Sequence, residues 1–72
     1  MALEIFKDEI EKRRIEKRIK VFELALACSK SISQVSAWFN GYGNLPEESI
    51  IKMIEFLGGE IIIGEPPKLR WD

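Results

Sequence analysis

The stretch ELALACSKSISQVSAWFNG, residues 23–41, contains the pattern that decides the fold. Its first part is compact and apolar, which favours a helix, and the small side chain of Ala25 would let a second helix approach closely. Ser31 is a favourable N-cap, because its hydroxyl can accept a hydrogen bond from a backbone N–H in the next turn. Gly41 suits the left-handed position that follows a helix. We therefore predict two short helices joined by a tight turn, at about residues 21–29 and 32–40.

The second of these helices is expected to have two different faces. Val35 and Trp38 are spaced i, i+3, so both should point inward, and Trp38 is better explained as core than as a stacking platform. For Phe39 the sequence leaves two alternatives open: it packs inside, or it is partly exposed to the following loop, to DNA sugars or to a second subunit. No residue from 31 to 44 is charged. The outward face would therefore contact a partner by shape and hydrogen bonds.

The segments on either side of this pair also have helical patterns. Leu3, Phe6 and Ile10 lie at i, i+3, i+7, which predicts one long helix over roughly residues 3–18, with a break near Arg18–Lys20. Pro46, followed by two glutamates, marks the start of a fourth helix. Its apolar stripe comprises Ile50, Ile51, Ile54 and Leu57, and the glycine pair at 58–59 should end it.

After the glycine pair the pattern changes. The segment EIIIGE, residues 60–65, is β-branched and bounded by glycine, which predicts a short strand. The prolines of PPKLRWD prevent its continuation as a central strand. The expected fold is mainly α, with four helices and a short C-terminal β-strand. It divides into a helical domain at residues 1–59 and a strand with a Pro-containing tail at residues 60–72.

Composition excludes several classes of protein. The chain has 72 residues, of which 46% are hydrophobic and 32% charged, as in a single globular domain. One cysteine and no histidine make a metal site improbable, and Cys28 is better explained as a buried apolar residue than as a reactive thiol. We find no nucleophile–base pair and no phosphate-binding glycine loop, so we expect neither an enzyme nor a cofactor. No apolar run suits a membrane span or a signal peptide, and we expect a cytoplasmic protein.

The charge is distributed unevenly along the chain. Residues 12–20, KRRIEKRIK, contain six Lys or Arg against one Glu, although the formal net charge of the whole chain is −1. Most of this run could be a solvated helix face with i, i+4 ion pairs, or it could contact phosphate. The lysines at the expected helix ends near the motif are best placed for phosphate: Lys17, Lys20 and Lys30.

Residues 23–41 resemble, in order and without a gap, the helix-turn-helix of phage repressors and Cro proteins, the lambda-repressor-like or XRE-like family. The segment LPEESIIKMIEFLGGEI is similar to the next helix of that family. The resemblance extends over roughly residues 10–62. It implies a four-helix domain that binds double-stranded DNA and regulates transcription, for example as a repressor of phage or plasmid type.

The resemblance also implies roles for individual residues. The positions that enter the major groove correspond to Ile32, Ser33, Gln34 and Ala37. Asn40 matches a position that commonly contacts the phosphate backbone, and the loop from Tyr42 to Asn44 would lie along the same DNA strand. Gln34 could pair with adenine, and Ile32 or Ala37 could contact a thymine methyl group, whereas no arginine is placed to recognise guanine.

Two expectations concern partners. A strand of the EIIIGE type is too short to stand alone, so it could pair with the same strand of a second subunit in a homodimer. The residues expected in this dimer contact are Ile61, Ile62, Ile63, Leu69 and Trp71. Alternatively, the chain keeps the helix-turn-helix fold without DNA readout and binds a protein partner, as an antitoxin does. In that case Ile32, Phe39 and Tyr42 would form the binding patch.

Overall fold

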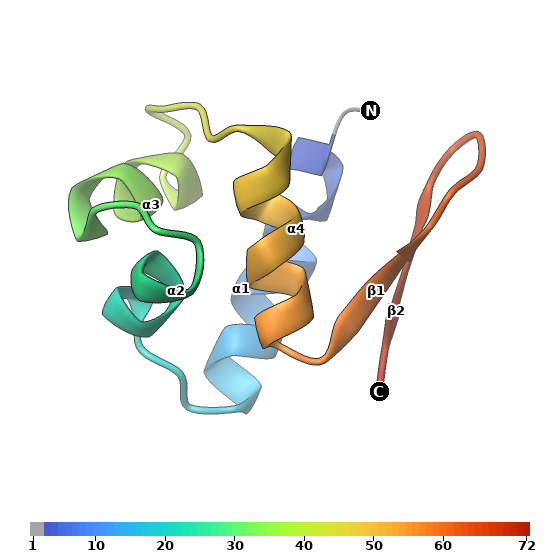
Figure 1. Ribbon diagram of the computed structural model, residues 1–72, viewed down its shortest axis with the longest axis horizontal. Helices are drawn as coiled ribbons and strands as arrows, with labels where there is room; N and C mark the ends of the chain where they lie inside the picture. The colour runs from blue at the N-terminus through green and yellow to red at the C-terminus, as the bar shows by residue number, and fades with distance from the viewer. Residues whose placement is uncertain (1–2) are drawn as a thin grey trace.

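The computed structural model describes residues 3–72 and is mainly helical, with a small antiparallel sheet at its C-terminal end (Figure 1). A 3₁₀ helix at Leu3–Phe6 leads directly into the first α-helix. The α-helices are α1 (Lys7–Glu16), α2 (Val21–Ala27), α3 (Ile32–Phe39) and α4 (Glu47–Phe56). The strands are β1 (Gly59–Ile62) and β2 (Lys68–Trp71). In the view of Figure 1, α4 lies in front of α1, with α2 and α3 to one side of it and the hairpin to the other.

The core lies where the four helices meet. Leu24 of α2 and Val35 and Trp38 of α3 have no exposed surface, and neither do Met53 and Ile54 of α4. The inward positions predicted for Val35 and Trp38 are therefore confirmed. Burying side chains of this size contributes about 1.5–3 kcal/mol each, which makes this cluster the main source of stability in so small a domain.

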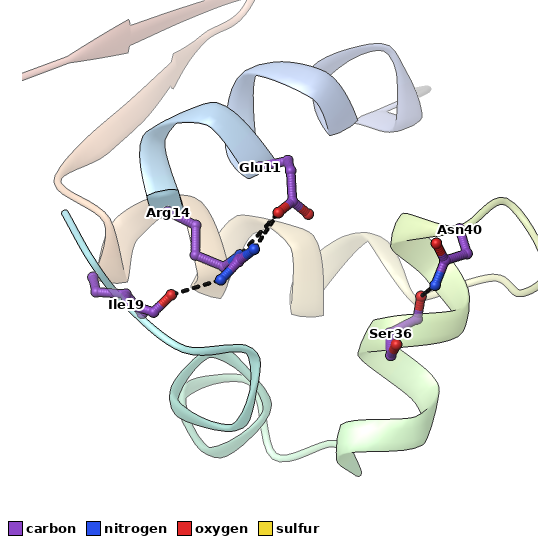
Figure 2. A network of polar contacts seen from close by, with 5 residues as sticks. All are labelled: Glu11, Arg14, Ile19, Ser36 and Asn40. Atoms are coloured by element: carbon purple, nitrogen blue, oxygen red, sulfur yellow. Dashed lines mark hydrogen bonds and ion pairs between the residues drawn. The ribbon is translucent and has the colours of Figure 1, made fainter. Parts of the chain in front are cut away.

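The predicted break after the first helix is present and begins slightly earlier than expected. Helix α1 ends at Glu16, and Arg18 adopts a left-handed conformation with φ of 56°. The Arg14 guanidinium holds the following segment, because Nη1 donates to the carbonyl oxygen of Ile19 at 2.8 Å and Nε donates to Glu11 at 3.2 Å (Figure 2). The apolar stripe of Leu3, Phe6 and Ile10 does not continue to Ile15, which is 60% exposed and does not belong to the core.

The C-terminal segment corrects one sequence-based prediction. Residues 60–72 were expected to form one strand and an irregular tail, but β1 pairs with β2 of the same chain, with Ile61 opposite Leu69. Antiparallel pairing across so short a connection costs little loop-closure entropy, so a local partner is favoured over one in a second subunit. The two prolines of the hairpin lie in the connection between its strands, where they remove no hydrogen bond from the strand ladder.

The hairpin packs against the helical body through its base. Ile61, Leu69 and Trp71 lie half-buried against the core, while Ile62 and Ile63 are exposed. Three of the five residues predicted for a dimer contact therefore contact their own chain, and two remain available. Within residues 3–72, no helix is long and apolar enough to cross a membrane.

Candidate nucleic-acid interface

Helix α3 begins at a capping box and ends in a Schellman motif. The Ser31 hydroxyl accepts a hydrogen bond from the Gln34 backbone N–H at 3.1 Å, and the Gln34 side-chain oxygen accepts one from the Ser31 N–H at 3.0 Å. At the other end Gly41 has φ of 81°, and the Tyr42 N–H donates to the Ala37 carbonyl at 2.9 Å. Both helix ends predicted for α3 are confirmed, so the helix is fixed independently of any partner.

The core anchors leave one face of α3 open to solvent. Because Val35 and Trp38 point inward, Ile32, Ser33 and Gln34 point outward, and Ile32 is 55% exposed. We call these three residues the recognition surface. Ala37 lies one turn further along but is half-buried, since the loop after α3 covers it: a Cβ on Gly43 would lie 3.4 Å from the Ala37 Cβ. Ala37 is therefore less accessible than the other three predicted base contacts.

The Gln34 side chain is held in place by the cap of its own helix. Its oxygen accepts a hydrogen bond from the Ser31 N–H, and within residues 3–72 no acceptor engages its NH₂ group. A bidentate contact with adenine would use the oxygen as acceptor and the NH₂ as donor. The NH₂ group is available for such a contact, and the oxygen would have to accept a second hydrogen bond or release the cap.

Asn40 is oriented by the last turn of α3. Its side-chain Nδ2 donates to the Ser36 carbonyl oxygen at 2.9 Å, and the residue is exposed (Figure 2). Only one of the two amide hydrogens is used in this bond, so the second can donate to a phosphate oxygen. Tyr42 and Asn44 in the following loop are exposed as well, Tyr42 by 88%.

The basic run at residues 12–20 separates into two groups with different environments. The side chains of Arg13 and Arg14 are only 18% and 19% exposed and bind groups of their own chain. Lys17 and Lys20 are exposed on the connection between α1 and α2, and Arg18 lies exposed between them. Lys30 is half-buried in the turn before α3. The sequence-based prediction placed Arg18 at the break after the first helix but did not include it among the candidate phosphate contacts.

Two further side chains are less ambiguous in the structure than in the sequence. Phe39 is half-buried and packs on Trp38, with ring centroids 5.1 Å apart, so it belongs mainly to the interior. Cys28 is buried, and its burial raises the pKa of the thiol, which keeps it protonated and unreactive at neutral pH. Among residues 3–72, no cluster of three or more His, Cys, Asp or Glu side chains is arranged to hold a metal ion.

The helix-turn-helix class of DNA-binding proteins is defined by two helices joined by a tight turn. The second helix is capped, crosses the shorter first helix and has an outward polar face. A helix-turn-helix family model matches residues 10–62 of the chain. The protein therefore belongs to this family, in its lambda-repressor-like form, which is a family of DNA-binding transcription regulators. No curated protein and no solved structure is significantly similar to the chain.

Proposed function

We propose that the protein is a transcriptional repressor of phage or plasmid type that binds a specific DNA site as a homodimer. The observation that supports this proposal best is the recognition surface itself. Ile32, Ser33 and Gln34 are exposed on a helix that is capped at both ends. A rigid helix with an open polar face is suited to enter the major groove.

In the proposed complex, α3 lies in the major groove with its first turn toward the base edges. Ser33 and Gln34 supply the hydrogen bonds, and the apolar side chain of Ile32 contacts a thymine methyl group. Ala37 contributes only where the groove comes close to the α3–α4 loop. In a homodimer the two α3 helices would contact successive major grooves, about 34 Å apart, so the DNA site would be a palindrome of two half-sites.

Attraction to the DNA backbone would come from residues around the recognition surface, because the surface itself has no charge. Lys17, Lys20 and Lys30 are the proposed phosphate contacts, together with Asn40 and the loop residues Tyr42 and Asn44. Arg18 joins this set because it is exposed between two of the lysines. Phosphate contacts of this kind position the protein on the duplex, whereas the bases provide specificity.

The salt dependence of binding tests the proposal. Each neutralised phosphate contributes a slope of about −0.9 to log K against log salt. A dimer with these four cationic side chains per subunit should therefore show a slope of about −7 on its DNA site. Lys20→Ala should reduce the magnitude of that slope by about 2, because both subunits lose one contact. Lys68→Ala, which removes an exposed lysine on the hairpin, should leave it unchanged.

These measurements need a duplex that binds, and selection from a random-sequence pool provides it. Binding affinity that does not change between 50 and 200 mM salt would contradict the DNA-binding proposal. Equal slopes for Lys20→Ala and the unmodified protein would instead contradict the placement of this lysine on phosphate.

A second candidate function is an interaction module that binds a protein, for example as an antitoxin-like partner. It is favoured by the apolar character of the same surface, since Ile32 is 55% and Tyr42 is 88% exposed. Phe39 contributes little to such a patch, because it packs on Trp38. Failure to enrich any duplex from the random pool would favour this second function over the first.

A further inference from the structure

Two hollows lie on either side of α4, away from α1. The first has a volume of about 680 Å³ and lies between α2 and α4, where Leu26 and Phe56 line it. The second, of about 270 Å³, lies between α4 and β1 and is lined by Ile51 and Ile63. Glu55 lines both hollows, so they form one continuous surface, which we call the α4 face. No residue of α1 or α3 lines either hollow.

The α4 face is more apolar and more exposed than a monomer requires. Leu26 is 75% exposed, Ile63 86% and Phe56 47%, although each belongs to an ordered part of the fold. Single exposed apolar side chains are ordinary, but contiguous groups of them around a hollow mark an interaction site. The domain is also small enough to gain appreciably from burying such a surface.

The charges on the α4 face make it complementary to itself. Lys52 lines the first hollow together with the acidic side chains of Glu23 and Glu55. Across a two-fold axis, the lysine of each copy would face the acidic side chains of the other, and the same apolar residues would meet from both sides. A partner with charges of one sign would leave either the lysine or the glutamates opposed to a like charge. The occupant that satisfies both is a second copy of this chain.

We infer that the α4 face is the dimer interface, with a second copy packed against it across a two-fold axis. Leu26 and Phe56 form its apolar centre, and Ile63 extends it onto the hairpin. The inference rests on the proposed function, in which the chain acts as a homodimer, and it names the surface responsible. Because α3 does not line the face, both recognition surfaces stay free for DNA.

Leu26→Glu tests the apolar centre, and Ile15→Glu is the matched control, since Ile15 is also exposed but lies on α1. Light scattering over a concentration series should show a dimer for the unmodified chain and the control. For Leu26→Glu the dimer dissociation constant should rise at least ~100-fold, because the symmetric interface loses the contact twice. Circular dichroism should show that both variants keep the helical content of the unmodified chain.

The outcomes separate the interface from the function. If Leu26→Glu leaves the dimer dissociation constant unchanged, the α4 face is not the dimer interface, although the protein still forms a dimer. A monomer at every concentration would overturn both the dimer and this inference. In either case, the salt slope on a random duplex still tests DNA binding by itself, because single subunits retain their phosphate contacts.

A charge exchange tests the two-fold axis without disturbing the core, since Lys52 and Glu55 are both exposed. Lys52→Glu and Glu55→Lys should each weaken self-association, because like charges then face one another. Mixed together, the two variants should form a heterodimer with a dissociation constant within about tenfold of the unmodified protein. If each single variant self-associates more weakly but the mixture does not restore binding, the two-fold arrangement is wrong. If neither single variant self-associates more weakly, the α4 face is not the dimer interface.

Discussion

Trp38 is the largest side chain by which α3 packs into the core. It is fully buried, packs against Phe39, and lies under the Lys7 ammonium group, which is 5.1 Å from the ring. Its indole nitrogen is buried without a hydrogen-bond partner. The residue therefore contributes a large apolar contact together with an unpaired donor, and these two contributions have opposite signs.

Two substitutions at Trp38 should separate these contributions. Trp38→Ala should lower the free energy of unfolding by about 3–5 kcal/mol, because it leaves a large cavity. Trp38→Phe should cost distinctly less, since it keeps most of the ring and removes the unpaired N–H. Urea unfolding followed by circular dichroism measures both. Equal losses for the two variants would contradict the large apolar contribution of the ring, because both variants remove the N–H and only Trp38→Phe keeps an aromatic ring.

The basic run shows at the residue scale how much of the environment of each side chain the sequence can indicate. Lys17 and Lys20 were predicted as phosphate contacts from their position near a helix end, and the structure leaves both exposed. Arg13 and Arg14 have the same charge but bind carbonyl and carboxylate groups of their own chain. The partners of Arg13, which are Leu57 and Asp72, are far away in the sequence, so no local pattern could reveal them. Arg14 instead binds its near neighbours Glu11 and Ile19.

At the scale of the element, helix ends were the least predictable feature. Gly41 and Gly58 follow α3 and α4 with positive φ, as expected for glycine after a helix. Arg18 and Ser29 follow α1 and α2 in the same left-handed conformation, with φ of 56° and 57°. A side chain other than glycine or asparagine is uncommon there, so no residue type marked these positions and the ends of both helices were predicted too late.

Ser29→Gly should therefore stabilise the protein. A non-glycine residue in the left-handed region costs about 1–2 kcal/mol, part of which is offset by the extra flexibility of glycine in the unfolded chain. We expect a gain of about 0.5–1 kcal/mol in the free energy of unfolding, measured in urea. Ser36→Gly in the middle of α3 is the control and should lower stability by about 0.5 kcal/mol. A loss on Ser29→Gly would contradict the assigned turn.

At the scale of the whole molecule, the hairpin is fixed to the helices at its base by one cluster. The Arg13 Nε donates to the Leu57 carbonyl at 3.1 Å, its Nη2 pairs with Asp72, and its guanidinium lies 5.3 Å from the Trp71 ring. Strand β1 lies close to α4 because its first residue, Gly59, has no side chain. A Cβ at Gly59 would be 2.5 Å from the Trp71 ring of β2, so the ring occupies the space that a side chain would need. Arg13 thus connects α1, the end of α4 and the last strand.

Arg13→Ala should loosen the hairpin as a unit. We expect the free energy of unfolding to fall by about 1–3 kcal/mol, because a partly buried, charge-assisted contact is lost together with the packing on Trp71. Arg70→Ala is the matched control, since the Arg70 pair with Glu60 is exposed and should contribute less than about 1 kcal/mol. Hydrogen exchange should become faster in β1 and β2 for the first variant only. Similar effects of the two substitutions would contradict the role of Arg13.

The sequence by itself determined the helical elements, the inward positions of Val35 and Trp38, the Ser31 cap and the helix-turn-helix family. Each of these depends on spacing or capping within a few residues, which local interactions dictate. Only the tertiary structure decided that β1 pairs with β2, that Arg13 holds the hairpin, that Gly43 covers Ala37, and that hollows flank α4. These features depend on contacts between residues far apart in the chain, whose relative positions are fixed only when the core packs.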